Sequence, residues 1–183
     1  MLRSRFALIA ILVFASFQSV EAADSLELDA EKSKIEFVGK KSDGKHAGGF
    51  KKFSTVAIAD FEEPKNGSLS IEIDATSLWS DDEKLTNHLK NPDFFDVRKY
   101  PKITFKSNGI EAGEVEGKAA IIGTLTMLDK KAEIKVPCTV LVDEKTVTVD
   151  AAFVLDRSRW GMTYGEGKID NNVDITARLV FNR

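Results

Sequence analysis

Apolar and polar residues alternate with a period of two along most of this chain. Leu69, Ile71 and Ile73 are separated by polar side chains, and the run from Val173 to Phe181 repeats the pattern over five apolar positions. Successive side chains of a β-strand point to opposite faces, so this period predicts strands with one apolar and one solvated face. Similar runs centre on residues 35–37, 103–105, 125–127, 140–142 and 147–149.

Short turn sequences separate these runs. Strands joined by tight turns favour an antiparallel meander over β–α–β units. The chain has about eight such strands, and the one-sided pattern continues to the last of them, so the predicted fold is an all-β antiparallel barrel. A sandwich of two sheets is the structural alternative. The predicted turns are Ser42-Asp43-Gly44, Pro64-Lys65-Asn66-Gly67, Asn108-Gly109, Asp129-Lys130 and Asp143-Glu144.

One segment departs from the strand pattern. Residues 81–83 are acidic, which suits the positively polarised start of a helix. Leu85, His88 and Leu89 then fall on one face at helical spacing. Pro92 disfavours helical backbone at the residue before it and predicts the end of the helix. We therefore expect a short amphipathic helix at the mouth of the barrel.

The N-terminus has the features of a secretory signal peptide. Basic residues precede an apolar run at 6–17, and Val20 and Ala22 have the small side chains of a cleavage site. The run is shorter than the roughly 20 residues that span a bilayer. We expect residues 1–22 to be removed, which leaves one domain at 23–183 in the periplasm or the extracellular medium.

The charge of the mature chain argues against nucleic acid as a partner. Removal of the signal peptide takes two of the 26 basic and one of the 29 acidic side chains, leaving 24 and 28. The two signs are interspersed, whereas binding to phosphate backbones requires a basic stripe or patch. No later run is apolar and long enough to span a membrane. We expect neither a nucleic-acid partner nor a membrane span after cleavage.

Patterns typical of catalysis or metal binding are scarce. His46 and His88 are the two histidines, and no third one completes the usual nitrogen-ligand zinc site. Neither HExxH nor GxSxG occurs. Cys138, the single cysteine, lies in an alternating run that predicts a buried or half-buried structural thiol. We therefore predict no catalytic residue, no metal and no cofactor.

The apolar faces of the predicted strands carry medium-sized side chains. An eight-stranded barrel is just wide enough to be filled by side chains or to hold one slender ligand. A long apolar chain would suit such an interior, because each buried methylene contributes about 0.8 kcal/mol. A barrel filled by its own side chains stays open as the alternative. The inward candidates are Ile35, Ile71, Ile73, Ile103, Leu125 and Val149.

Four ordered segments resemble the YceI-like, polyisoprenoid-binding family, and HLKNPDFFDVRKYPKITFKS is the most specific of them. The resemblance implies a lipocalin-like antiparallel barrel of eight strands. It further implies a periplasmic or secreted protein that holds a long-chain isoprenoid or related amphiphile, with no established catalytic step. The other segments are SKIEFVGKKSDGKHAGGFKKF, GTLTMLDKKAEIKVP, and DRSRWGMTYG followed by NNVDITARL.

The predicted function is therefore a binding protein that sequesters or carries an apolar chain. For every candidate residue, ordinary core packing is the alternative role. The expected wall of the site consists of Phe37, Phe50, Phe53, Ile103, Phe105, Leu125 and Met127. The expected mouth or lid consists of Leu85, Leu89, Phe94, Phe95, Trp160 and Met162. Polar contacts to a head group are expected from His88, Arg157 and Tyr164.

Two functions of other classes stay open at this point. One is an enzyme that acts on a quinone or lipid, with His46 and His88 in a composite acid/base or metal site. The other is an interaction module with a filled barrel, alone or as a homodimer, whose Phe94 and Phe95 pack on a partner.

Overall fold

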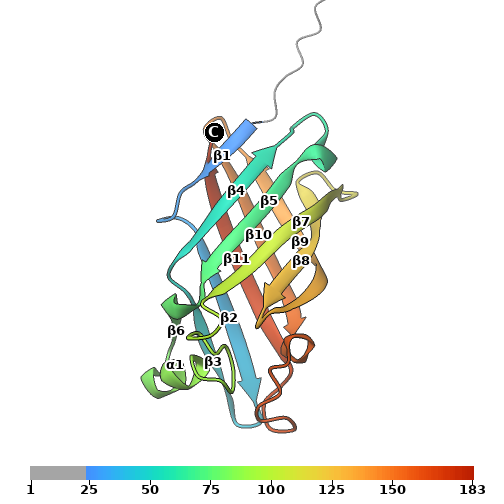
Figure 1. Ribbon diagram of the computed structural model, residues 1–183. Coiled ribbons are helices and arrows are strands. Elements are labelled where there is room, and N and C mark those ends of the chain that lie inside the picture. Colours follow the sequence, from blue (N-terminus) through green and yellow to red (C-terminus); the bar gives the residue numbers. More distant parts are fainter. Residues whose placement is uncertain (1–23) are drawn as a thin grey trace, which may run out of the picture.

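The computed structural model describes residues 24–183, in which antiparallel strands form one sheet that closes into a barrel (Figure 1). The predicted signal peptide, residues 1–22, lies outside the described residues. The helical elements are α1 (Glu83–Leu89) and the 3-10 turns η1 (Pro64–Asn66), η2 (Ala75–Ser77) and η3 (Arg157–Trp160). The strands are β1 (Asp24–Leu28), β2 (Lys34–Lys41), β3 (Gly44–Phe50), β4 (Phe53–Ala59), β5 (Ser68–Asp74), β6 (Leu78–Ser80), β7 (Lys102–Ala112), β8 (Lys118–Met127), β9 (Lys130–Val142), β10 (Thr146–Asp156) and β11 (Asn172–Asn182).

The eleven strands occupy eight positions around the barrel. The ring runs β1–β4–β5–β7–β8–β9–β10–β11 and closes because β1 also pairs with β11. The remaining three strands lengthen the wall of the barrel at one end. There β2 pairs with β11, β3 with β2, and β6 with β3. The predicted eight-stranded antiparallel barrel is confirmed, and the sandwich alternative is wrong.

One end of the barrel is filled by its own side chains. Leu26 of β1, Val147 of β10 and Phe181 of β11 are 8%, 4% and 1% exposed and belong to the main hydrophobic core. Phe181 is the register partner of both Leu28 and Val147, so these strands meet around it. We call this end the closed end.

The opposite end, which we call the mouth, carries the short helix. Asp82 caps α1, and its Oδ1 accepts a hydrogen bond from the Leu85 N–H at 2.7 Å. Leu89 and Phe94 pack with Leu78 of β6 in a small cluster that is separate from the main core. The predicted helix is confirmed. In residues 24–183, no helix is long and apolar enough to cross a membrane.

The predicted turn at Asn108-Gly109 is wrong. Both residues lie inside β7, where the register with β8 shifts between Ser107 and Gly109. A β-bulge inserts one residue into a strand without ending it, and glycine suits such a site. Elsewhere, the tight turn between β8 and β9 is formed by Leu128 and Asp129, whose φ angles are 52° and 61°. Two consecutive residues with positive φ match the twist of a hairpin.

The pairing of β9 with β10 covers only the half of β9 near the closed end. It stops at the partners Cys138 and Ala151. The next residue of β9 is Pro137, which has no N–H to donate to a ladder. On the mouth side η3 lies against β9, and the Arg159 guanidinium donates to the Glu133 carbonyl at 2.8 Å. Trp160 is fully buried, and its Nε1 donates to the Leu125 carbonyl at 3.1 Å.

Candidate functional site

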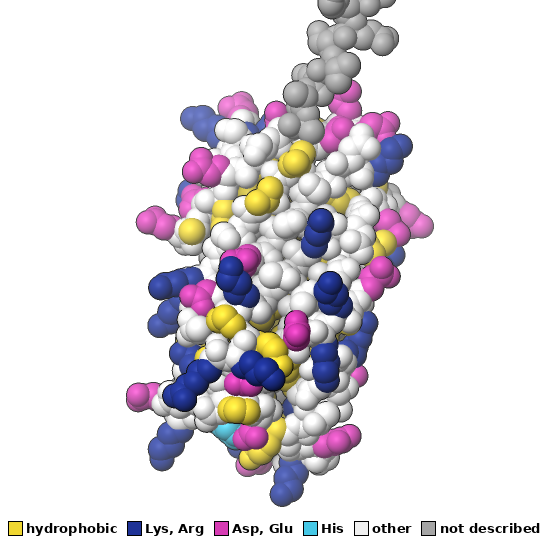
Figure 2. Space-filling model, viewed as in Figure 1, with side chains coloured by type: hydrophobic (Ala, Val, Ile, Leu, Met, Phe, Trp, Pro, Cys, Tyr) yellow, Lys and Arg dark blue, Asp and Glu magenta, His cyan; other side chains and the backbone are white. Residues whose placement is uncertain are grey.

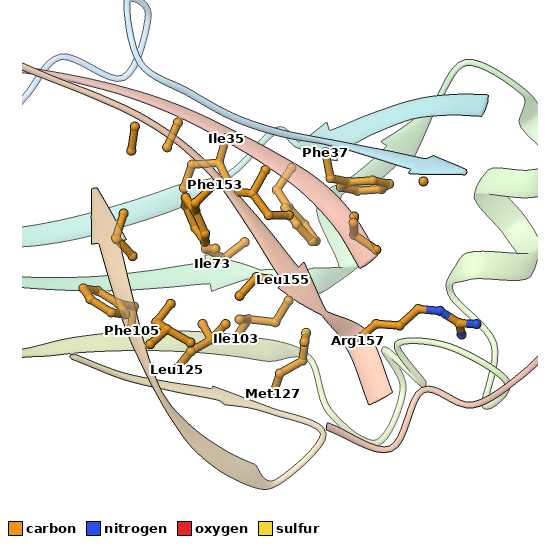
Figure 3. Close-up of a pocket in the computed structure, with 18 of the residues that line it drawn as sticks. Ile35, Phe37, Ile73, Ile103, Phe105, Leu125, Met127, Phe153, Leu155 and Arg157 are labelled. Carbon is orange, nitrogen blue, oxygen red and sulfur yellow. The ribbon is translucent and has the colours of Figure 1, made fainter. Parts of the chain in front are cut away.

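The barrel encloses an apolar cavity of about 280 Å³. That volume lies just below the roughly 300–1,000 Å³ typical of small-molecule sites. Strand alternation creates it, because every second side chain of β5, β7, β8, β10 and β11 faces inward. Figure 3 shows Ile35, Ile73, Phe105, Leu125 and Phe153 pointing into this space. The interior is therefore not completely filled by side chains.

Polar groups of the cavity wall are confined to the mouth. Lys40, Lys41 and His46 come from the β2–β3 hairpin, and Arg157 and Asp170 flank the loop between β10 and β11. Every other side chain in the described lining is apolar. Outside the barrel, by contrast, acidic and basic side chains are spread over the face in Figure 2. The cavity thus has a polar end and an apolar end, as an amphiphile does.

Twelve of the sixteen residues nominated from the sequence lie on the cavity wall. The other four lie outside the lining. Phe53 packs against the main core from β4, and Trp160 is a fully buried core residue beside the mouth. His88 and Tyr164 lie on the outer side of the mouth. The lining includes Phe37, Phe50, Leu85, Leu89, Phe94, Phe95, Ile103, Phe105, Leu125, Met127, Arg157 and Met162.

One part of the wall, along β10 and β11, was represented among the expected inward residues by Val149 alone. Inward-facing residues of β10 and β11 line the cavity and are only half-buried, whereas Ile103 and Leu125 on the opposite wall are 4% and 8% exposed. Empty space therefore lies before β10 and β11, and half-buried lining residues of other strands, such as Ile71 and Val136, also face it. The alternation of β10 and β11 is visible in the sequence. Alternation shows which side chains face the interior, but it does not show where empty space remains next to them. These residues are Val149, Ala151, Phe153, Leu155, Val173, Ile175 and Ala177.

Arg157 is a buried cation at the mouth. It is 6% exposed, and its guanidinium donates to three main-chain carbonyls, those of Met162 at 2.8 Å, Asp170 at 3.2 Å and Ile169 at 3.4 Å. Burial lowers the pKa of the guanidinium, and the charges of Asp156 and Asp170 act in the opposite direction. Arg157 therefore holds the loop after η3 against the barrel. The same loop contains Gly161, whose φ of 83° suits glycine.

Two groups of aromatic rings lie at the mouth. Phe37, Phe50 and Phe95 lie inside it, with ring centroids 5.8–6.5 Å apart. On the outer side, His88 meets Phe94 and Tyr164 edge to face at 5.1 and 4.9 Å. Such pairs contribute roughly 0.5–1.5 kcal/mol beyond their burial. The outer group joins α1 to the loop after η3, so the two segments that cover the mouth touch each other.

Each histidine pairs with an aspartate beside α1. His46 Nδ1 lies 2.9 Å from Asp81 Oδ1, and His88 Nε2 lies 2.9 Å from Asp93 Oδ2. The Ala47 N–H and then His46 hold the pKa of Asp81 below its usual range. Within residues 24–183, no three His, Cys, Asp or Glu side chains gather into a metal-binding group. The two histidines thus sit in separate pairs, each with its own aspartate.

A glycine beneath Phe105 leads to a stability prediction. A Cβ at Gly123 would lie 2.5 Å from Phe105 Cζ and 2.6 Å from the Lys106 carbonyl oxygen. Overpacking of this kind costs about 1–2 kcal/mol, so Gly123→Ala is expected to lower the free energy of unfolding by that amount. Urea denaturation measures it. Gly109→Ala on the neighbouring strand, where nothing lies within 4 Å, is the control, and an equal loss there would contradict the prediction.

The fold and cavity define a lipocalin-like barrel with an interior that opens at one end. The model of the YceI-like domain matches residues 26–181, and the chain belongs to that family. The family resemblance read from the sequence is thereby confirmed.

Curated relatives match over part of their length. The UPF0312 protein of Pseudomonas putida strain GB-1 is 34% identical over 80 residues, which are 44% of this chain and 41% of the relative. A UPF0312 protein of Vibrio parahaemolyticus is 31% identical over 80 residues, 44% and 42% of the two chains. Each alignment spans less than half of the relative.

Solved structures match over most of the barrel. Burkholderia cenocepacia BcnA is 30% identical with a TM-score of 0.79, and the alignment covers 84% of this chain and 99% of BcnA. A polyisoprenoid binding domain from Saccharophagus degradans has a TM-score of 0.69 at 13% identity, covering 88% and 99%. The Campylobacter jejuni YCEI protein has a TM-score of 0.62 at 22% identity, covering 74% and 84%. The last two likenesses concern the fold alone.

Proposed function

We propose that this protein binds a long-chain isoprenoid or a related amphiphilic lipid inside the barrel and sequesters or carries it outside the cytoplasm. The apolar cavity with its polar mouth carries the proposal. Burial of about ten methylenes would contribute about 8 kcal/mol, more than the lower estimates of about 4 kcal/mol for the cost of association. The predicted signal peptide supports the extracytoplasmic location, and the likeness to the polyisoprenoid binding domain from Saccharophagus degradans supports the ligand class.

Extraction of the native protein tests this proposal. The protein is purified from its own host without detergent, extracted with organic solvent, and the extract is analysed by mass spectrometry. One lipid species near one equivalent per chain is the expected result, and the intact mass also reports whether the chain begins at Ala23. An extract that contains only traces of mixed lipid would contradict the proposal. Expression in a foreign host would load substitute lipids.

Cys138 provides a reporter inside the cavity. It is 6% exposed and lines the wall, and burial raises the pKa of its thiol. We expect monobromobimane to label lipid-free protein slowly, and bound lipid to lower that rate severalfold because it occupies the approach to the sulfur. Fluorescence of the adduct measures the rate. A Cys138→Ser, Ser42→Cys variant, with its thiol on the exposed hairpin, is the control and should react at one rate with and without lipid.

A further inference from the structure

The depth of the cavity follows from the residues that line β10. Val149 is the lining residue of that strand nearest the closed end, and Arg157 follows its other end at the mouth. Eight residues of strand span about 26 Å. With the usual tilt of barrel strands, this corresponds to about 20 Å along the barrel. The long dimension of the cavity therefore runs from the mouth toward the closed end.

The cavity stops inside the barrel. Leu26, Val147 and Phe181 form the next inward layer beyond Val149, and none of them lines the cavity. Val147 is two residues from Val149 on the same strand and is 4% exposed. A chain that enters from the mouth would therefore meet packed side chains at the closed end.

The distribution of charge fixes which end of a ligand lies deepest. All five Lys, Arg, His and Asp residues of the lining are at the mouth, and the deepest lining residues, such as Leu69, Val149 and Leu179, are apolar. Burial of a polar head group among them, without hydrogen-bond partners, is strongly unfavourable. The head group therefore stays at the mouth and the tail points inward.

We propose that the cavity acts as a ruler for a single apolar chain, which enters tail first and contributes to binding only up to a length of about 20 Å. This inference rests on the proposed function and adds a selection for chain length and chain number to it. An eight-stranded barrel has room for one slender ligand, so the ligand class is a single-chain amphiphile. Any part of a longer chain would remain outside the mouth.

A series of ligands of increasing chain length tests this limit. Saturated fatty acids from octanoate to arachidate are titrated, below their micelle concentrations, against delipidated full-length mature protein that holds a fluorescent apolar probe. The dissociation constant is expected to fall about fourfold per added methylene, the equivalent of about 0.8 kcal/mol. It should then become constant once the extended chain reaches about 20 Å. A diacyl phospholipid in the same assay is expected not to displace the probe.

Two neighbouring alanines provide a matched pair of variants. Ala151 lines the cavity two residues from Val149, and Ala152 is exposed on the outer face of the same strand. Ala151→Phe should move the plateau to chains about 5 Å shorter, because it blocks the deepest part of the cavity. Ala152→Phe should leave the plateau at its wild-type length. Circular dichroism confirms that each variant is folded.

A second variant keeps the test decisive if Ala151→Phe does not fold. Val147→Ala removes side-chain volume from the layer that ends the cavity and should extend the plateau to longer chains. A plateau that stays at one length in the folded variants, or affinity that keeps rising to arachidate, overturns the ruler alone. Failure of every fatty acid to bind wild-type protein overturns the ruler and, together with an empty lipid extract, the proposed function.

Discussion

Replacing Ile175 with tryptophan is expected to lower the lipid content of the purified protein about tenfold. Ile175 lies midway along the accessible wall, with Phe153 and Phe37 as its register partners on β10 and β2. An indole at this position would occupy space that two or more methylenes of the ligand need. Because each buried methylene contributes about 0.8 kcal/mol, the loss of two corresponds to a complex about tenfold to fifteenfold weaker.

The measurement is the molar ratio of extracted lipid to protein, determined by quantitative mass spectrometry on protein from the native host. Thr176→Trp is the control, since Thr176 is the next residue of β11 and is exposed on the outer face. The two variants carry the same side chain on opposite faces of one strand. Equal lipid content in both, with folding retained, would show that the ligand does not occupy the wall along β10 and β11.

Replacing Arg157 with methionine is expected to lower the free energy of unfolding by about 2–4 kcal/mol. The substitution leaves the carbonyls of Met162, Ile169 and Asp170 without their donor. The Met162 carbonyl is buried, and a buried acceptor without a partner costs roughly 1–3 kcal/mol. The carbonyls of Ile169 and Asp170 are only part-buried and their bonds are longer, so each adds a smaller cost. The loss of burial for a charged group offsets part of this cost.

Arg159→Met in the same turn is the matched control. The Arg159 guanidinium makes one hydrogen bond at the surface, to the Glu133 carbonyl, so its loss should cost less than about 1 kcal/mol. Urea denaturation at neutral pH measures both variants, and an unchanged denaturant slope would confirm that the unfolded states are comparable. Similar costs for the two arginines would mean that Arg157 does not anchor the loop over the mouth.

Much of the fold could be predicted from local pattern. The alternation in β5, β7, β8 and β11 reports directly which side chains face inward, because the side-chain period of a strand is two. The short helix was equally visible, since its cap residue Asp82 and the proline after it act on neighbouring backbone. Asn108-Gly109 misled because the same two residues suit a tight turn and a bulge. Whether these two residues form a turn or a bulge depends on the pairing of β7 with β8, whose paired residues are distant in sequence.

The site was predictable only in part. Twelve nominated residues reached the cavity wall because they lie on inward faces or on the segments that close the mouth. Trp160 is an aromatic residue beside the mouth, as expected. Its Nε1 donates a hydrogen bond to the Leu125 carbonyl, however, and its ring is buried in the core. Apart from Val149, the wall along β10 and β11 was not among the expected inward residues, and several of its side chains are small, such as those of Ala151 and Ala177. Small residues are easily overlooked in a sequence, but their side chains leave empty space inside the barrel.

The amino-acid sequence alone determined the strand pattern, the helix and the resemblance to the family, all of which depend on nearest-neighbour chemistry and on motifs. Only the tertiary structure decided which end of the barrel is closed and where empty space remains. It also decided that Arg157 would be held by carbonyls of the following loop. These features depend on how side chains from strands far apart in the sequence add up in volume across the barrel. That sum is a property of packing and not of any local run of residues.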